Sequence, residues 1–213
     1  MTLHWMTTIT ASLRVWMMLT PWVSVWLQFQ TCLLFIFDLY SFFCFNYFFL
    51  RKYAALAVEA TKKFFSENPD ATSSAIADKV TNEQMASGLK SQDRIHIFVR
   101  AAFTTDFFKS KQVEKNASAI SKITQGKTVM ERHLISACEG LCVDEPKKFA
   151  VLLKQLFDED VLEEDTIFEW AGEGRTEYTL DSVDEEQRCA MRAEAEPVVV
   201  WLQEDDSSDE DSD

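Results

Sequence analysis

Residues 146–170, PKKFAVLLKQLFDEDVLEEDTIFEW, hold two apolar helical patterns on either side of an acidic link. The first helix is predicted to begin at Asp144-Glu-Pro146, and its apolar side chains recur three and four residues apart. These side chains are Phe149, Leu152, Leu153 and Leu156. The second helix is predicted from Glu163 to Trp170, with Gly172 available as its C-terminal cap. This pattern of short helices joined by short links predicts an all-α fold.

The same pattern extends over residues 53–203. We predict nine short helices, at residues 53–65, 72–80, 91–103, 106–113, 116–123, 128–141, 144–156, 163–170 and 182–202. Two of them are predicted to begin with capping boxes, Thr128-Val-Met-Glu131 and Ser182-Val-Asp-Glu185, and Pro197 should kink the last one. Five glycines and four prolines are too few for a turn-rich all-β fold. The expected fold is all-α, a HEAT-like stack of antiparallel helix pairs.

Charge is divided unevenly along the chain, whose formal net charge is -14. Residues 54–156 hold 15 basic and 12 acidic side chains, whereas residues 157–213 hold 3 basic and 22 acidic side chains. A field of this sign repels nucleic acid and attracts partners rich in lysine and arginine. Direct binding of DNA or RNA is therefore not expected.

The first 52 residues differ from the rest, since they are rich in Trp, Phe, Leu and Met and almost uncharged. Within them, residues 31–50, TCLLFIFDLYSFFCFNYFFL, are long enough to span a bilayer and precede Arg51-Lys52. Against a span, Asp38 would cost about 2.5–3.5 kcal/mol near the bilayer centre. Three interpretations stay open: a membrane anchor, a buried hydrophobic extension, and a translated pyrimidine tract that precedes a splice acceptor in the gene.

The last ten residues, 204–213, contain no apolar side chain and are predicted to form a disordered acidic tail. Ser207 and Ser208 each have an acidic residue three positions later, which suits phosphorylation by an acidophilic kinase of the casein kinase two type. A plain polar tail is the alternative. The expected organisation is a hydrophobic segment at 1–52, a helical domain at 53–203 and this tail.

Motifs of catalysis, cofactor binding and metal binding are missing from the sequence. It contains no glycine-rich phosphate loop, no G-x-S-x-G and no H-E-x-x-H. Cys138 and Cys142 are one helical turn apart without a matching second pair, which favours buried reduced thiols over a zinc site. His96 and His133 are expected to be packing or surface residues. We therefore predict no enzyme activity, no cofactor and no metal.

Two acidic segments near the C-terminus each surround one tryptophan, Trp170 in the first and Trp201 in the second. With their flanks they read LKQLFDEDVLEEDTIFEW (residues 153–170) and AEAEPVVVWLQED (residues 193–205). These blocks resemble the two acidic–aromatic boxes of the W2 domain family, the HEAT-like C-terminal module of several translation factors. Within that family they are most similar to the C-terminal domain of eukaryotic translation initiation factor five.

The resemblance implies a W2-type fold and a monomeric, cytoplasmic adaptor in translation initiation. Its implied partners are lysine-rich segments of other initiation factors, chiefly the beta subunit of factor two, and also the c subunit of factor three and factor one. By motif, the partner-binding residues would be Asp158, Glu159, Asp160, Glu163, Glu164, Asp165, Glu169, Trp170, Glu194, Glu196, Trp201, Glu204, Asp205 and Asp206.

The two tryptophans have a second interpretation as core residues. Val198, Trp201 and Leu202 stand at core spacing on a helix, and Trp170 follows Ile167 by three positions. In that case the tryptophans fix the helices, and the acidic side chains between them form the binding surface.

Initiation factor five, the family member that these blocks resemble most, also has a GTPase-activating domain with an arginine finger, and a zinc ribbon. The sequence motifs of these two domains do not occur in this sequence. GTPase activation by this chain alone is therefore not predicted. Two alternatives to the adaptor stay open. One is another W2 protein, either a factor-five mimic or the epsilon subunit of the exchange factor, and the other is a membrane-anchored acidic adaptor that depends on residues 31–50.

Overall fold

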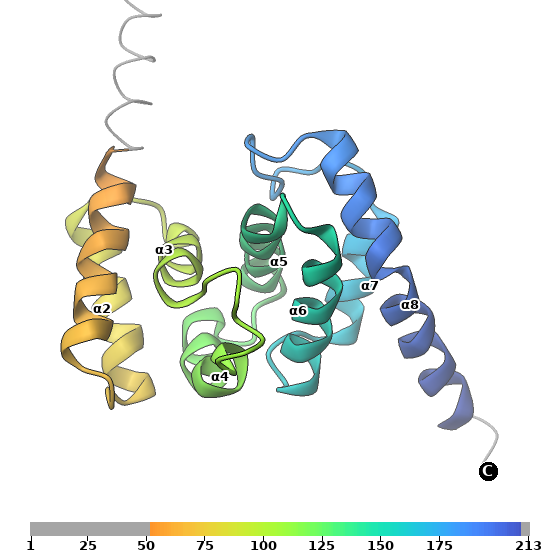
Figure 1. Ribbon diagram of the computed structural model, residues 1–213, viewed down its shortest axis with the longest axis horizontal. Coiled ribbons are helices and arrows are strands. Elements are labelled where there is room, and N and C mark those ends of the chain that lie inside the picture. Colours follow the sequence, from red (N-terminus) through yellow and green to blue (C-terminus); the bar gives the residue numbers. More distant parts are fainter. Residues whose placement is uncertain (1–51, 210–213) are drawn as a thin grey trace, which may run out of the picture. The chain divides into compact units, whose positions relative to one another are not determined.

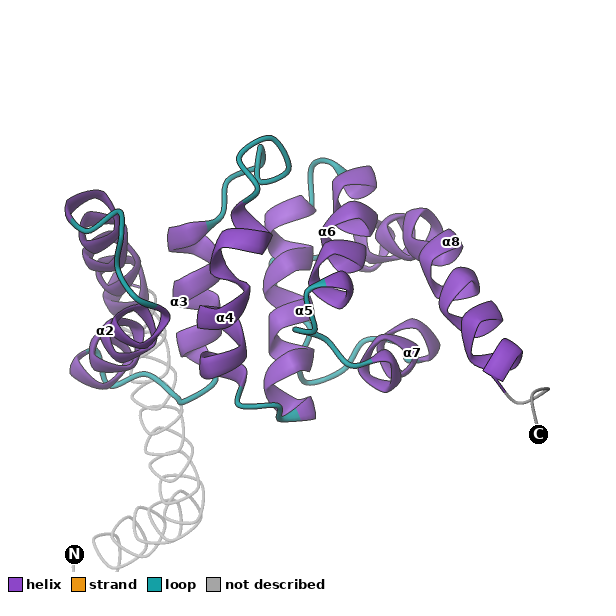
Figure 2. Cartoon of the chain, turned by 90° about the horizontal axis from the view of Figure 1, so that it is seen from below, coloured by secondary structure: helices purple, strands orange, loops and turns teal. Residues whose placement is uncertain are grey.

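The computed structural model describes residues 52–209, with side chains described as far as Glu204. A first helix covers residues 52–67. The helices that follow are α2 (Ser73–Ala86), α3 (Asp93–Ala102), α4 (Gln112–Thr124), α5 (Thr128–Cys142), α6 (Pro146–Asp158), α7 (Glu164–Gly172) and α8 (Glu185–Asp209). Between residues 52 and 209 there is no strand (Figure 2), so the all-α prediction is confirmed.

The helices stack one after another in chain order (Figure 1). α2 packs on α3 and α4, α3 and α6 pack on α5, and α8 closes the stack by packing on α6 and α7. The predicted apolar stripe of α6 lies in the core, with Phe149, Leu152, Leu153 and Leu156 all buried. Burying each such side chain contributes about 1.5–3 kcal/mol, so this stripe anchors the middle of the stack.

The predicted capping box at the start of α5 is wrong. The N-cap residue is Lys127, which makes no side-chain capping bond, and Thr128 is already helical. Glu131 is only 2% exposed, and its Oε2 accepts hydrogen bonds from the Glu163 backbone N–H at 3.2 Å and the Thr166 hydroxyl at 2.9 Å. Because Glu163 is the N-cap residue of α7, this carboxylate caps a different helix from its own.

The capping box predicted at Ser182 and Glu185 lies two residues further along the chain. The Gln187 backbone N–H donates to the Asp184 carboxylate at 2.8 Å, and the Asp184 backbone N–H donates to the Gln187 side chain at 2.9 Å. Aspartate and glutamine satisfy the same two free amides as serine and glutamate would. The spacing of the box was therefore correct, and its position was wrong.

Residues 106–113 do not form the separate helix predicted from the sequence. They are turns until α4 begins, and Lys111 adopts a left-handed backbone conformation with φ of 51° immediately before it. Phe107 is buried while Phe108 is exposed, so only one of the two phenylalanines belongs to the core. The segments predicted at 106–113 and 116–123 are thus a turn followed by one longer helix.

The end of α7 also differs from the prediction, because Gly172 is its last residue and Glu173, with φ of -94°, follows as the C-cap. Another glycine has a packing role. A Cβ atom at Gly140 of α5 would lie 2.7 Å from Leu180 Cδ1. The absence of a side chain at Gly140 therefore lets the α7–α8 connection lie directly on α5.

The predicted terminal segments lie mostly outside the described residues. α8 continues to Asp209, whereas the sequence placed the end of the helical domain at residue 203. Residues 1–51 lie outside the described part, including the candidate span at 31–50. Among the residues that the structure describes, no helix has the length and hydropathy needed to cross a membrane.

Candidate functional site

The two tryptophan segments contact each other in the folded chain. The Trp201 ring of α8 packs edge-on against Phe157 of α6, with ring centroids 5.9 Å apart, and Lys154 Nζ lies 4.3 Å from the Trp201 ring centroid. α6 and α8 run side by side in the same direction (Figure 1). Ala190, early in α8, lines the same surface hollow as Lys147 at the start of α6, and Trp201, later in α8, contacts Phe157 at the end of α6. Trp201 and the residues at the C-terminal end of α6 therefore lie together on one side of the stack.

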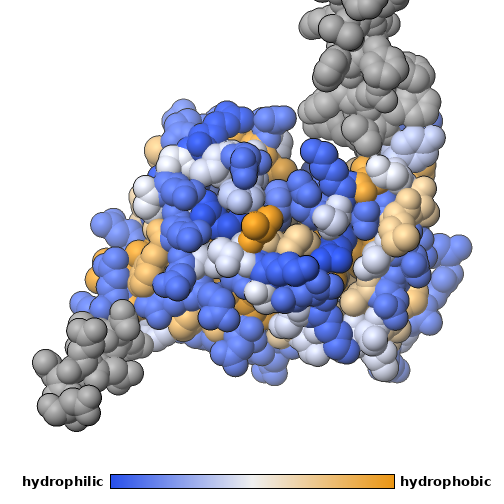
Figure 3. Space-filling model, turned by 180° about the vertical axis from the view of Figure 1, so that it is seen from behind, coloured by the Kyte–Doolittle hydropathy of each residue, from blue (hydrophilic) through white to orange (hydrophobic). Residues whose placement is uncertain are grey.

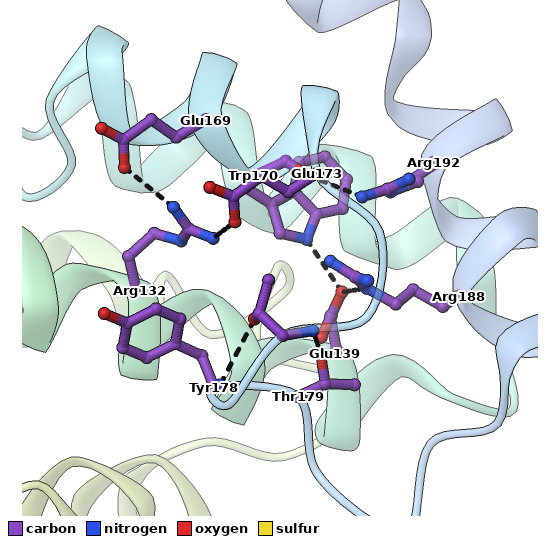
Figure 4. A network of polar contacts seen from close by, with 10 residues as sticks. Arg132, Glu139, Glu169, Trp170, Glu173, Tyr178, Thr179, Arg188 and Arg192 are labelled. Carbon is purple, nitrogen blue, oxygen red and sulfur yellow. Dashed lines mark hydrogen bonds and ion pairs between the residues drawn. The ribbon is translucent and has the colours of Figure 1, made fainter.

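Trp170 is a core residue, since it is 3% exposed and packs on Phe149 at a ring-centroid distance of 5.1 Å. Its indole N–H donates to Glu139 Oε1 of α5 at 2.8 Å (Figure 4). Its backbone carbonyl accepts a hydrogen bond from Arg192 of α8 at 2.9 Å. In this conformation the Trp170 ring cannot form part of an exposed partner-binding surface, which matches the core interpretation.

A buried ion pair joins α5 to α8 beneath Trp170. Glu139 and Arg188 are 1% and 2% exposed, and Arg188 Nε lies 3.3 Å from the Glu139 oxygen that also accepts the Trp170 N–H. Burial raises the pKa of Glu139, and the hydrogen bond from Trp170 and the Arg188 charge oppose that rise. Sequence reasoning missed this pair; its only signal was a glutamate within the otherwise apolar segment around Cys138.

A second network ties α5 to the end of α7. Arg132, which is buried, forms an ion pair with Glu169 at 2.8 Å and a second one with Glu173, and its guanidinium lies 5.0 Å from the Tyr178 ring centroid. Figure 4 shows Arg132 between these groups. The charge of Glu169, predicted to face a partner, is therefore compensated within the domain.

The remaining acidic residues of the first box surround the turn between α6 and α7. Asp158 forms an ion pair with Lys154 at 2.8 Å, and Glu164 is partly buried in the first turn of α7. Four others make no ion pair among the described residues, and we call them the acidic turn. They are Glu159, Asp160, Glu163 and Asp165.

The acidic turn is accessible to solvent, with Asp160, Glu163 and Asp165 exposed and Glu159 partly exposed. The helix dipole favours negative charge at Glu163 and Asp165, at the start of α7. It gives no such support to Glu159 and Asp160, which follow the end of α6, where the dipole disfavours negative charge. Stability of the helices alone therefore does not account for this concentration of carboxylates.

The second box contributes acidic side chains from α8. Glu194 and Glu196 are exposed on this helix and make no ion pair with any described residue. Glu204 is exposed near the end of α8, on the side of the stack where α6 also ends. The side chains of Asp205, Asp206, Ser207 and Ser208 lie outside the described part, so their predicted roles stay predictions.

The remaining candidate residues for chemistry are packed inside the domain. Cys138 and Cys142 are buried and reduced, and burial raises the pKa of Cys142 to about 12. His96 and His133 contact each other at a ring-centroid distance of 5.7 Å, and burial lowers the pKa of both. Among the described residues no group of side chains is arranged to hold a metal ion.

Three comparisons bear on the identity of the domain. Residues 130–212 match the W2 family model, described as eIF4-gamma/eIF5/eIF2-epsilon. Eukaryotic translation initiation factor 5 of Caenorhabditis elegans is 26% identical over 142 residues, which is 64% of this chain and 30% of the length of that relative.

The solved structure of the C-terminal domain of translation initiation factor 5 at low pH has the same fold. It aligns with a TM-score of 0.55 at 18% identity and covers 74% of this chain and 97% of its own. Together with the family match, which includes both tryptophan segments, this likeness confirms the resemblance seen in the sequence. Residues 130–212 are therefore similar to the W2 domain described as eIF4-gamma/eIF5/eIF2-epsilon.

Proposed function

We propose that this chain is a protein-interaction module of translation initiation, and that its acidic turn binds lysine-rich segments of other initiation factors. The W2 family and the relative named above support the process. The beta subunit of factor two, the c subunit of factor three and factor one are the partners that the resemblance suggests. The chain would act in the cytoplasm, as an adaptor and without catalysis.

The observation that carries this proposal is the contrast between paired and unpaired carboxylates in one box. Glu169 and Asp158 are held by Arg132 and Lys154, whereas no side chain of the acidic turn forms an ion pair with a described residue. Two unit charges 4 Å apart attract by about 1 kcal/mol in water and more near a protein surface. Several such contacts with one flexible basic segment reinforce each other.

The face of the domain seen in Figure 3 is mostly hydrophilic. Hydrophilic side chains cover most of that face, and hydrophobic side chains are scattered among them. Single exposed apolar residues of this kind do not form a docking surface. A hydrophilic face with few apolar anchors gives no support to a partner that docks through an apolar surface, and the exposed carboxylates of the acidic turn favour a basic, extended one.

The test is a fourfold neutralisation of the acidic turn, Glu159→Gln, Asp160→Asn, Glu163→Gln and Asp165→Asn. Asparagine tolerates the left-handed conformation that residue 160 adopts, with φ of 53°. We expect the affinity for an oligolysine peptide, measured by calorimetry, to fall at least tenfold at low salt. Wild-type affinity should itself decrease as salt is added, because exposed charges are screened.

A matched control changes the net charge by the same amount at the other end of the stack. Its substitutions are Glu59→Gln, Glu67→Gln, Asp70→Asn and Asp78→Asn, all at exposed positions. Both variants should keep a cooperative thermal unfolding transition. If the control weakens binding as much as the acidic-turn variant does, net charge alone attracts the peptide and the proposed site is wrong.

A further inference from the structure

Lys154 is held between an aromatic ring and a carboxylate at the contact between the two boxes. Its Nζ lies 4.3 Å from the centroid of the Trp201 ring and 2.8 and 3.0 Å from the two oxygens of Asp158. The ring is supported from its side by Phe157, which packs edge-on against it. A ring face and a carboxylate together satisfy the charge of an ammonium group.

We propose that Trp201 and Asp158 form a lysine-binding subsite, which Lys154 occupies in the free protein and which a lysine of the basic partner takes over. The inference rests on the proposed function and names a residue-level contact within it. Lys154 is then an internal competitor that weakens binding of the partner and makes it reversible.

Lys154 and Asp158 are exposed, so replacing Lys154 by a lysine of the partner costs little free energy. The side chains of Lys154 and Asp158 are 45% and 47% exposed. Exposed ion pairs on one helix and exposed cation–π contacts are both weak in water. Lysine has a flexible four-carbon stem, so Lys154 can move into solvent and leave the Trp201 face and the Asp158 carboxylate for another ammonium group.

The position of the subsite suits a segment with several lysines. Asp158 is followed directly by Glu159 and Asp160, the first two residues of the acidic turn. Once one lysine binds at Trp201, its neighbours are held close to these carboxylates at a high effective concentration. The subsite would thus fix the position of a segment that the acidic turn attracts at longer range.

The first measurement follows Lys154 by NMR during titration of the full chain with an oligolysine peptide. In the free protein the ring current of Trp201 should shift the Lys154 side-chain signals away from their solvent-exposed positions. We expect the peptide to return them to those positions. A peptide with glutamine in place of lysine is the control and should leave them unchanged.

The second measurement compares two variants with the same charge change on α6. Lys154→Met keeps the apolar stem and frees the subsite, and Lys147→Met removes an exposed lysine that makes no ion pair with any described residue. We expect Lys154→Met to bind oligolysine about two- to fivefold more tightly than Lys147→Met does. Trp201→Leu added to each variant should remove that difference.

The outcomes separate this inference from the proposed function. If oligolysine binds with salt dependence while the Lys154 signals stay in place, or if the two methionine variants bind equally, the subsite is wrong and the acidic turn remains the binding surface. If oligolysine does not bind at all, both proposals are overturned. Movement of the Lys154 signals together with tighter binding by Lys154→Met supports the subsite.

Discussion

At the scale of single residues, the two tryptophans share a sequence context and differ in environment. Trp170 is buried with its N–H bonded to Glu139, while Trp201 is partly exposed beneath Lys154. Each tryptophan has an apolar neighbour at helical spacing in the sequence, which favoured a core position for both. It did not show that a buried carboxylate would receive the Trp170 N–H, because Glu139 lies 31 residues away along the chain.

The first residue-scale prediction concerns the buried pair of Glu139 and Arg188. Glu139→Gln or Arg188→Met alone should lower the free energy of unfolding by about 3–5 kcal/mol, because each leaves the other charged group buried without its partner. The double variant should lose less than the sum of the two. Urea unfolding of all four proteins measures this coupling, and additive effects would contradict it.

The second residue-scale prediction concerns pH. Burial, then His133 and Arg100, lower the pKa of His96 from 6.5 to about 4. Between these values the unfolded chain binds the proton that the folded chain excludes, so the free energy of unfolding should fall as pH drops from 7 toward 4. The full shift corresponds to at most about 3 kcal/mol.

The control for this pH dependence is His96→Gln, which removes the titrating group and leaves the carboxylates in place. Burial also lowers the pKa of His133, as it does that of His96. Asp93 and Glu177 oppose this shift of the His133 pKa, and Lys90 adds to it. Urea unfolding across this pH range should give a shallower slope for His96→Gln than for wild type. Equal slopes would show that His96 does not contribute.

At the scale of elements, most helices begin and end close to where sequence patterns placed them; the errors lie at their ends and in the segment 106–113, which is mostly a turn. Caps depend on which side chain reaches a free amide, and in α7 that side chain comes from another helix. The segment around Phe107 and Phe108 has helical composition, yet a left-handed residue at Lys111 separates it from α4. Local spacing cannot distinguish these cases, because tertiary packing selects between them.

The element-scale prediction concerns the cap that Glu131 provides for α7. Glu131→Ala removes the acceptor for the Glu163 backbone N–H and the Thr166 hydroxyl. We expect a loss of about 1–3 kcal/mol in the free energy of unfolding and faster amide exchange at Glu163. Glu67→Ala, on the exposed surface of the first helix, is the control and should change stability by no more than about 0.5 kcal/mol. Undisturbed exchange at Glu163 in the Glu131 variant would contradict the capping role.

At the scale of the whole domain, stacking the helices in chain order converts a charge gradient along the sequence into one in space. Residues 157–209, which carry most of the acidic excess, form the end of α6, α7, α8 and their connections at one end of the stack (Figure 1). Such a separated charge steers a cationic partner toward that end, and the effect is screened within roughly 8 Å at physiological salt.

The prediction at this scale is kinetic. The association rate constant for an oligolysine peptide, measured by stopped flow with wild-type protein, should fall steeply as salt increases, while the dissociation rate constant changes less. Steering by the whole acidic end causes this difference, because screening acts before contact. A salt dependence confined to dissociation would contradict it.

The sequence by itself determined the helical class, the stripe of α6, the family resemblance and the acidic excess of the last quarter. These properties depend on local spacing and composition, which each segment carries without its neighbours. Only the tertiary structure decided which carboxylates are unpaired, since Arg132 compensates Glu169 and Lys154 compensates Asp158. It also decided that Trp170 is buried and that Trp201 faces a lysine. Lys154 and Asp158 are neighbours on one helix, whereas Glu169, Trp170 and Trp201 meet partners that are distant in the chain, and packing alone brings those partners together.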